Sequence, residues 1–475
     1  MTTNPRNLTL LLLLLSYCIF FLPSCEPEVD TPEPSAGMAD FSRYIALGNF
    51  FSSGFADGAL SKQGQLASFP NILAQQMKLV DGADTFNIPL LKGDKGTFPD
   101  DSYGPAHYNL TLPRFILEKD TSCDGEIEIL PERMDTIGDD EINLSDETQR
   151  IYEIGKNMHH LGIPAMKSFH VNSPGYANVG NYGTPRAFNP YFWRFAPDPV
   201  NSSTVFFVAV TARPTFFTME LGMSDVLSYA IDGGIGIVDG SADEDITSVS
   251  RFEAALGQIL DTLINRGATG LIATVPDVTT FPYFTTIEYD ALDLTAGKAD
   301  TMNDMYESNP NIGRIFHEGE HNPFVIKEDG VVRVINSDEF VLLGIDVDLL
   351  KCLDLGAYEP IGDEYILSKE EIENVVQYIA NYNRIIKALA AERQQHLAIV
   401  DLAKFIDRIY QETTIDGIDL TAEFASGGFF SLDGLTPNDR GQALIANEFI
   451  KVINKEFGAK LPLINSTQYR GVLFP

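Results

Sequence analysis

A short apolar run at Tyr44–Leu47, followed at once by Gly48 and Asn49, constrains the fold of this chain most. A run of this length that ends in a glycine-containing turn is typical of a buried strand, and the residues after it predict a helix. In open α/β sheets, ligands and reacting groups usually lie where a strand's carboxyl end meets the next helix. The sequence therefore predicts an α/β fold with its candidate site at residues 48–58.

Other segments along the chain have helical periodicity or the continuous apolar run of a buried strand. We expect helices at 69–77, 252–264, 367–393 and 442–457, strands at 215–221, 271–275 and 397–400, and a hairpin within 324–335. Acidic stretches at about 80–158 and 295–363, the first of them irregular, predict two insertions into one domain that spans 41–475.

The chain has 475 residues and a formal net charge of −34, which repels phosphate backbones and argues against nucleic-acid binding. Its first 24 residues, with an apolar core from Leu8 to Leu22, predict a signal peptide. The sequence before Cys25 resembles a bacterial lipobox, which implies a lipid anchor on Cys25 and attachment to the membrane. An ordinary secretory signal is the alternative. Residues 25–40 predict an acidic, proline-rich tether.

The acidic residues directly after Cys25 resemble the surface-export signals of Bacteroidetes lipoproteins. The expected location is therefore the cell envelope, as an outer-membrane lipoprotein.

Four blocks of the chain resemble those of the SGNH (GDSL) hydrolases, a family of serine ester hydrolases. They are Gly48-Asn-Phe-Phe-Ser-Ser-Gly54, His160-Leu-Gly-Ile-Pro-Ala-Met166, Gly222-Met-Ser-Asp225 and Asp433-Gly-Leu-Thr-Pro437. The resemblance implies a three-layer αβα, flavodoxin-like domain with a mainly parallel central sheet.

The same resemblance places a different residue at each position that gives the family its name. Phe50 stands where the nucleophilic serine is expected, Ala165 at the oxyanion glycine, Ser224 at the oxyanion asparagine and Thr436 at the histidine base. Asp433, which would orient the base, is kept. Phenylalanine has no nucleophilic atom, and threonine does not accept a proton near neutral pH. The substitutions predict a chain without triad catalysis.

Nearby residues offer a conceivable replacement for the lost groups. Ser52 and Ser53 follow Phe50, and His159, His160 and His170 lie near the second block. No histidine has the Asp-x-x-His spacing of the family, and the two serines are better explained as hydroxyls that cap the start of a helix. The candidate cleft residues are Gly48, Asn49, Phe50, Ser52 and Asp225.

Three further features leave alternatives open. His317-Glu-Gly-Glu-His321 matches a zinc-protease pattern, but Gly319 and the flanking Asn-Pro pairs favour a chance match in a loop, and we expect neither a metal nor a cofactor. Trp193 belongs either to an aromatic rim or to a packed loop. Cys123 and Cys352 either form a disulfide or remain free thiols.

Three functions are compatible with these observations. The first is a non-catalytic member of the fold that binds an acyl or lipid ligand, or an outer-membrane barrel, through the old cleft. The second is an esterase or lipase that uses atypical residues. The third is a surface interaction protein that uses its insertions while the cleft is filled.

Overall fold

The computed structural model describes residues 33–80, 82, 85–96, 113–121, 123, 125, 127–134, 150–153, 157–181, 188–199, 203–411 and 414–475. Residues 34–475 form one compact unit. The predicted signal peptide, Cys25 and most of the predicted tether lie outside the described residues. Within the part that is described, no helix is long and apolar enough to cross a membrane.

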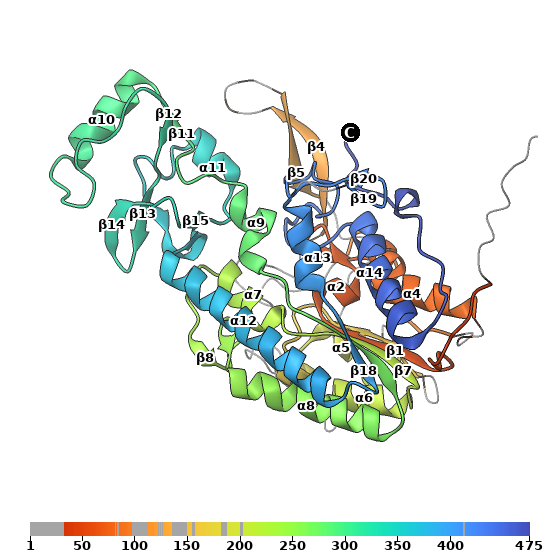
Figure 1. Ribbon diagram of the computed structural model, residues 1–475. Coiled ribbons are helices and arrows are strands. Elements are labelled where there is room, and N and C mark those ends of the chain that lie inside the picture. The colour runs from red at the N-terminus through yellow and green to blue at the C-terminus, as the bar shows by residue number, and fades with distance from the viewer. Residues whose placement is uncertain are drawn as a thin grey trace, which may run out of the picture. The chain divides into compact units, whose positions relative to one another are not determined.

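The centre of the unit is a sheet of five strands that all run parallel (Figure 1). In spatial order they are β6 (His160–Gly162), β1 (Tyr44–Gly48), β7 (Phe216–Glu220), β10 (Thr269–Ala273) and β18 (Leu397–Val400). Along the chain this is the order 2-1-3-4-5, in which the connection reverses direction beside β1. The predicted parallel α/β sheet is confirmed, and its topological switch point lies at β1.

The strands form where the sequence has apolar runs because both faces of the sheet are covered. All five residues of β1 and all five of β7 are buried. Such runs are typical of parallel strands that lie between layers of helices. The strands expected near 44–47, 215–221, 271–275 and 397–400 are therefore confirmed, with ends that shift by at most two residues.

Helices flank this sheet on both sides (Figure 1). On one side, α4 (Phe69–Lys78) packs against α14 (Asp439–Phe457), where the rings of Phe69 and Phe449 stack at 4.7 Å. On the other side, α8 (Val249–Asn265) packs against α12 (Lys369–Glu392), where Phe252 and Tyr382 stack at 4.1 Å. These are the four helices that the periodicity predicts.

The remaining elements are short. The other helices are α2 (Phe50–Ser53), α3 (Lys62–Ala67), α5 (Pro190–Trp193), α6 (Val205–Thr211), α7 (Ser224–Ile231), α9 (Pro282–Thr285), α10 (Ala296–Tyr306), α11 (Val347–Cys352) and α13 (Leu402–Ile409). The other strands are β2 (Phe55–Ala56), β3 (Ala59–Leu60), β4 (Phe115–Thr121), β5 (Ile127–Arg133), β8 (Val238–Gly240), β9 (Ile246–Thr247), β11 (Leu292–Leu294), β12 (Gly319–Asn322), β13 (Val325–Glu328), β14 (Val331–Val334), β15 (Phe340–Val341), β16 (Ile361–Gly362), β17 (Ile366–Leu367), β19 (Thr414–Ile415) and β20 (Ile418–Asp419).

The first insertion contains an antiparallel hairpin of β4 and β5, paired from Phe115–Arg133 to Thr121–Ile127. The prediction of an irregular segment over about 80–158 is wrong at this point. Charged residues interrupt the hairpin's apolar pattern, because much of it is exposed, and this conceals the strands in the sequence.

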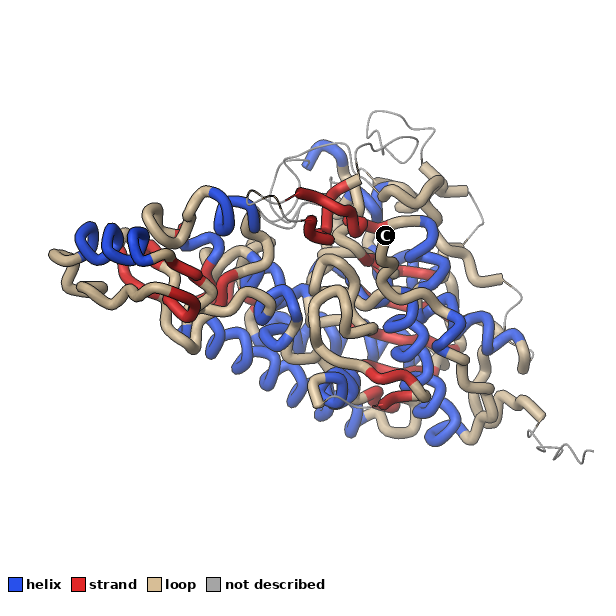
Figure 2. The backbone as a smooth tube through the Cα atoms, turned by 90° about the horizontal axis from the view of Figure 1, so that it is seen from above, coloured by secondary structure: helices blue, strands red, loops and turns tan. Residues whose placement is uncertain are grey.

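The second insertion has a hydrophobic core of its own, separate from the core around the sheet. Helix α10 and the strands β11 to β15 belong to it (Figure 2). Its hairpin of β13 and β14 confirms the hairpin expected within 324–335.

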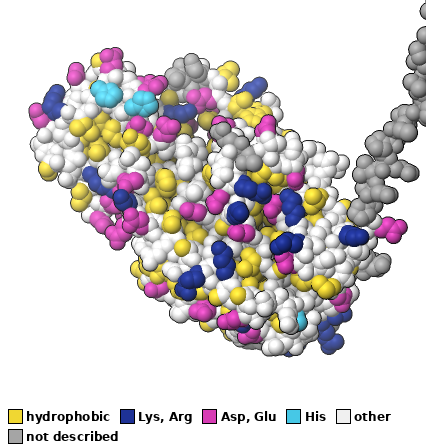
Figure 3. Space-filling view, viewed as in Figure 1, with side chains coloured by type: hydrophobic (Ala, Val, Ile, Leu, Met, Phe, Trp, Pro, Cys, Tyr) yellow, Lys and Arg dark blue, Asp and Glu magenta, His cyan; other side chains and the backbone are white. Residues whose placement is uncertain are grey.

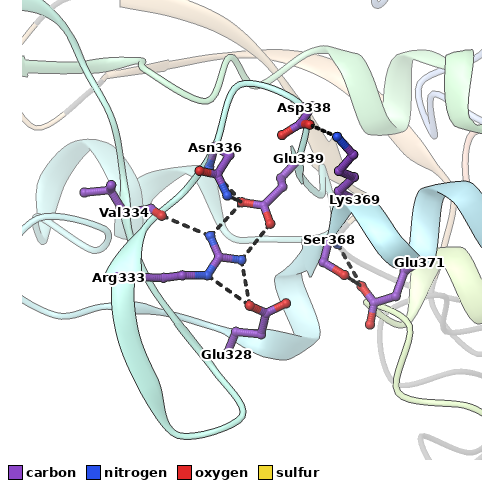
Figure 4. Close-up of polar contacts among 9 residues, drawn as sticks. All are labelled: Glu328, Arg333, Val334, Asn336, Asp338, Glu339, Ser368, Lys369 and Glu371. Atoms are coloured by element: carbon purple, nitrogen blue, oxygen red, sulfur yellow. Dashed lines mark hydrogen bonds and ion pairs between the residues drawn. The ribbon is translucent and has the colours of Figure 1, made fainter. Parts of the chain in front are cut away.

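Charged residues tie this insertion to the start of α12 (Figure 4). Arg333 on β14 lies between two carboxylates, with Nη2 2.7 Å from Glu328 Oε2 and 2.6 Å from Glu339 Oε1. The ammonium group of Lys369, the first residue of α12, lies 2.9 Å from Asp338 Oδ2. These contacts hold the loop after β14 between the hairpin and the helix.

A disulfide joins Cys123, between β4 and β5, to Cys352 at the end of α11. The sequence left open whether these two cysteines pair or remain free thiols, and the structure shows that they pair. The bond connects the first insertion to the second across 229 positions of sequence. Beside it, Lys351 Nζ lies 2.6 Å from Glu128 Oε2.

Candidate functional site

The carboxyl end of β1 carries the candidate site. Gly48 lies level with Gly162 of β6 on one side and with Glu220 of β7 on the other. A Cβ atom on Gly48 would lie 2.0 Å from Ser52 Oγ, and one on Gly162 would lie 2.5 Å from Ser53 N. Both glycines are needed because α2 packs directly onto the ends of these two strands.

The predicted cleft residues are all buried at this junction. Asn49 is 0% exposed and Phe50 only 2%. The ring of Phe50 lies edge-on to Phe55 at a centroid distance of 5.2 Å. Ser52 and Asp225 are buried as well. At the position of the expected nucleophile, the structure therefore places an apolar side chain inside the core.

Ser52 and Ser53 do not cap α2, so that part of the sequence interpretation is wrong. Ser52 Oγ donates a hydrogen bond to Glu220 Oε2 at 3.0 Å, and Ser53 Oγ donates to Phe50 O at 2.8 Å. The reason lies in β7, which ends in a buried carboxylate that the first turn of α2 covers. The backbone amides of Ser52 and Asn49 also donate to Glu220 Oε2, at 3.1 and 3.3 Å.

Glu220 is the residue of this site that the sequence interpretation missed. Burial raises its pKa to about 7, and the hydrogen bonds from Ser52 and Asn49 oppose that rise. The sequence signal that could have revealed it is a glutamate at the end of a mainly apolar strand, Phe216–Glu220, two residues before Gly222.

Asp433 and Thr436 contact each other, as their spacing of three residues predicts. Thr436 Oγ1 donates to Asp433 Oδ2 at 2.6 Å, and Thr436 N donates to Asp433 Oδ1 at 2.8 Å. Gly58 N donates to the same carboxylate at 3.0 Å, which attaches the last block to the end of the first. The threonine hydroxyl thus donates to the carboxylate for which the sequence resemblance predicts a histidine partner.

The two expected oxyanion positions are Ala165, in the loop after β6, and Ser224, the first residue of α7, and the segments that carry them are also joined. Asp225, beside Ser224, accepts hydrogen bonds from Ser168 N at 2.9 Å and Ser168 Oγ at 2.7 Å. Burial raises the pKa of Asp225, and the bonds from Ser168 oppose this. Ser224 is buried, and its hydroxyl has no hydrogen-bond partner among the described residues. Ala165 has a φ of 60°, a left-handed conformation that glycine adopts without strain.

The nearby histidines do not form a base for either serine. His160 Nε2 lies 3.0 Å from Ser68 Oγ, and burial lowers the pKa of His160 to about 4. His159 Nδ1 accepts a hydrogen bond from Asn87 N at 3.0 Å. His170 stacks on Tyr176 at 4.5 Å. His160 is therefore paired with Ser68 and not with Ser52 or Ser53, and both members of that pair are buried.

Trp193 packs inside the protein. It ends α5 and is 1% exposed, so it belongs to the core and not to the rim of a cleft. Of the two interpretations, an aromatic rim or a packed loop, the packed position is therefore correct. Trp193 lies in a short helix, however, and not in a loop.

The His317–His321 motif does not form a helix. Its second half is strand β12, and both histidines are exposed. His321 Nδ1 lies 3.3 Å from Asp290 Oδ2. Across the described ranges, no group of three or more histidine, cysteine, aspartate or glutamate residues is placed to hold a metal ion.

The structure thus brings the four sequence blocks to one end of the sheet, through Gly48, Gly162 and Glu220 and through the contacts of Asp225 and Asp433.

Comparison of the chain with protein-family models, with curated proteins and with solved structures finds no match.

Proposed function

We propose that this chain is a catalytically inactive member of the SGNH hydrolase fold that works by binding a partner through its surface. The observation that supports this most strongly is the closed junction at β1. Phe50 is 2% exposed and packs on Phe55. The two serine hydroxyls that follow it are bound within the protein, Ser52 to Glu220 and Ser53 to Phe50 O. Because Ser52 is 1% exposed, we expect that a substrate carbonyl does not reach its hydroxyl.

The closed junction at β1 also makes it unfavourable for an acyl chain to bind among the predicted cleft residues. The insertions are better candidates for a binding surface, because the second has its own core and is joined covalently to the first. On the face drawn in Figure 3, several lysine and arginine side chains gather near the middle, although the whole chain is strongly acidic. A partner at the outer membrane, such as a barrel protein, fits the proposed location.

Ester hydrolysis tests the inactive assignment. Both hydrophobic cores lie within residues 34–475, so a chain that begins at Glu26 keeps the whole described fold. We expect this chain to hydrolyse no p-nitrophenyl ester, from acetate to palmitate, faster than buffer. Turnover that disappears in Ser52→Ala but persists in Ser53→Ala would replace this proposal with an esterase that uses Ser52.

The proposed lipid anchor has its own test. Cells that express the full chain with radiolabelled palmitate should label it, and Cys25→Ser should abolish the label. Cys18→Ser is the matched control, because Cys18 lies inside the predicted signal peptide and should not change labelling. Equal labelling of the two variants would contradict the anchor.

A further inference from the structure

A cavity of about 280 Å³ lies at the edge of the candidate site, where Ala56 and Asp57 line it. Its walls come from the segment between α2 and α3, from the first turn of α3, from the start of β4, from Leu432, from the start of α14 and from residues 470–475. None of the predicted cleft residues lines this cavity. Its volume is near the lower end of the range for small-molecule sites, roughly 300–1,000 Å³.

Four charged side chains line the cavity, namely Asp57, Asp439, Arg114 and Arg470. The two carboxylates already have hydrogen-bond donors from the protein. Asp57 Oδ1 accepts from Leu432 N at 3.0 Å, and Asp439 Oδ2 accepts from Gln63 Nε2 at 2.8 Å.

Neither guanidinium group has a close hydrogen-bond acceptor in the part of the chain that is described. Arg114 Nε is buried without a hydrogen-bond partner among those residues, and Arg114 Nη1 forms a long ion pair with Asp57 Oδ2 at 3.9 Å. The guanidinium of Arg470 is exposed, and its positive charge opposes the rise that burial gives the pKa of Asp439. The cavity therefore offers donors that match a planar oxyanion.

Apolar side chains form another part of the wall, among them Phe115, Leu432 and Phe474, and the uncharged polar residues Ser61, Gln63 and Asn438 line it as well. Arg133 lies over the ring of Phe115 at 3.8 Å, which fixes that ring in place. Phe474 is 58% exposed, more than is usual for a side chain that packs only within the protein. An apolar body in the cavity would cover part of its ring.

We propose that this cavity binds a small amphipathic monoanion, a carboxylate attached to a short apolar body. The carboxylate would lie between Arg114 and Arg470, and the apolar body would lie against Phe115 and Leu432. A dianion such as a phosphate monoester fits less well, because Asp57 and Asp439 line the same space and would repel a second negative charge. The site extends the proposed binding role, but it does not depend on the β1 junction being inactive.

Calorimetric titration of the Glu26-onward chain with octanoate tests this site. We expect saturable binding of octanoate, weaker binding of octanol, which lacks the anion, and weaker binding of acetate, which lacks the apolar body. Because a hydrogen bond to a charged group contributes more than a neutral one, Arg114→Gln and Arg470→Gln should each lower octanoate affinity by about tenfold or more.

Arg384→Gln is the matched control, since Arg384 is exposed on α12 and does not line the cavity. Melting temperatures of all three variants should stay close to that of the parent, which separates loss of binding from loss of fold. The proposal fails if the parent does not bind octanoate, if octanol binds as tightly, or if the two cavity variants bind like Arg384→Gln. None of these results affects the ester-hydrolysis test, so the two proposals can fail separately.

Discussion

The hydroxyl of Thr436 donates a 2.6 Å hydrogen bond to Asp433, a buried carboxylate that also accepts from Gly58 N. Thr436→Val removes the donor and keeps the shape of the side chain. Because the carboxylate then loses one of its partners while it stays buried, we expect a loss of about 1–3 kcal/mol in the free energy of unfolding, measured by urea titration. Thr436→Ser keeps the hydroxyl and should lose less than the valine variant. The reverse order would mean that methyl packing, not the hydrogen bond, matters here.

Glu220 gives the stability of the protein a predictable pH dependence. Its pKa is about 7 in the folded chain, against an ordinary value of 4.5, so between these values the folded state holds a proton that the unfolded state has lost. Stability from this group is therefore present below about pH 4.5 and decreases as pH rises towards 7. Glu220→Gln cannot lose this proton, so we expect the free energy of unfolding of the variant to fall less than that of the parent as pH rises, by on the order of 3 kcal/mol.

Urea midpoints at pH 5 and pH 8 measure this effect, as the difference between the parent and Glu220→Gln. Glu253→Gln, at an exposed position on α8, is the control and should follow the parent at both values. An unchanged pH dependence in Glu220→Gln would show that the carboxylate is not desolvated as its burial implies.

Phe50 should behave as a core residue. Replacing it with serine removes a buried ring and brings a polar group into an apolar site, so we expect a loss of at least about 3–5 kcal/mol in stability. Phe50→Leu should cost less. The serine variant should also gain no ester hydrolysis, because Thr436 provides no base. A Phe50→Ser chain that is as stable as the parent would mean that the ring does not fill the junction.

The disulfide predicts the number of free thiols. The Glu26-onward chain contains only Cys123 and Cys352, so after unfolding without reductant it should react with no thiol reagent, and after reduction with two equivalents. Chain-entropy arguments give a stabilisation of about 2–5 kcal/mol for such a bond, which the Cys123→Ser, Cys352→Ser double variant should lose. Two reactive thiols before reduction would contradict the bond.

The sheet and its main helices could be predicted because their signals are local. The apolar runs at β1, β7 and β18 and the periodicity of α8 and α12 persist in the structure, since buried parallel strands and amphipathic helices impose those patterns. The β4–β5 hairpin could not be predicted, because its side chains are largely exposed and its sequence lacks a clear alternation of apolar and polar residues.

The candidate site was only partly accessible from the sequence. The residue at each expected position could be named, and the contact between Asp433 and Thr436 follows from their spacing. The bond between Ser52 and Glu220 joins residues 168 positions apart, and nothing in a single sequence specifies such a pair. The same holds for the cavity, whose two arginines come from segments more than 350 residues apart.

The bond between Cys123 and Cys352 closes a covalent ring of chain that includes three of the five central strands, β6, β7 and β10. A single cut by a protease anywhere inside this ring, in either insertion or in a loop between them, would leave both new ends in one molecule. The whole stretch that the ring encloses could be opened without any fragment being released. After one cut inside the ring the two parts of the chain would stay covalently joined, and their separation would need a second cut or a reductant.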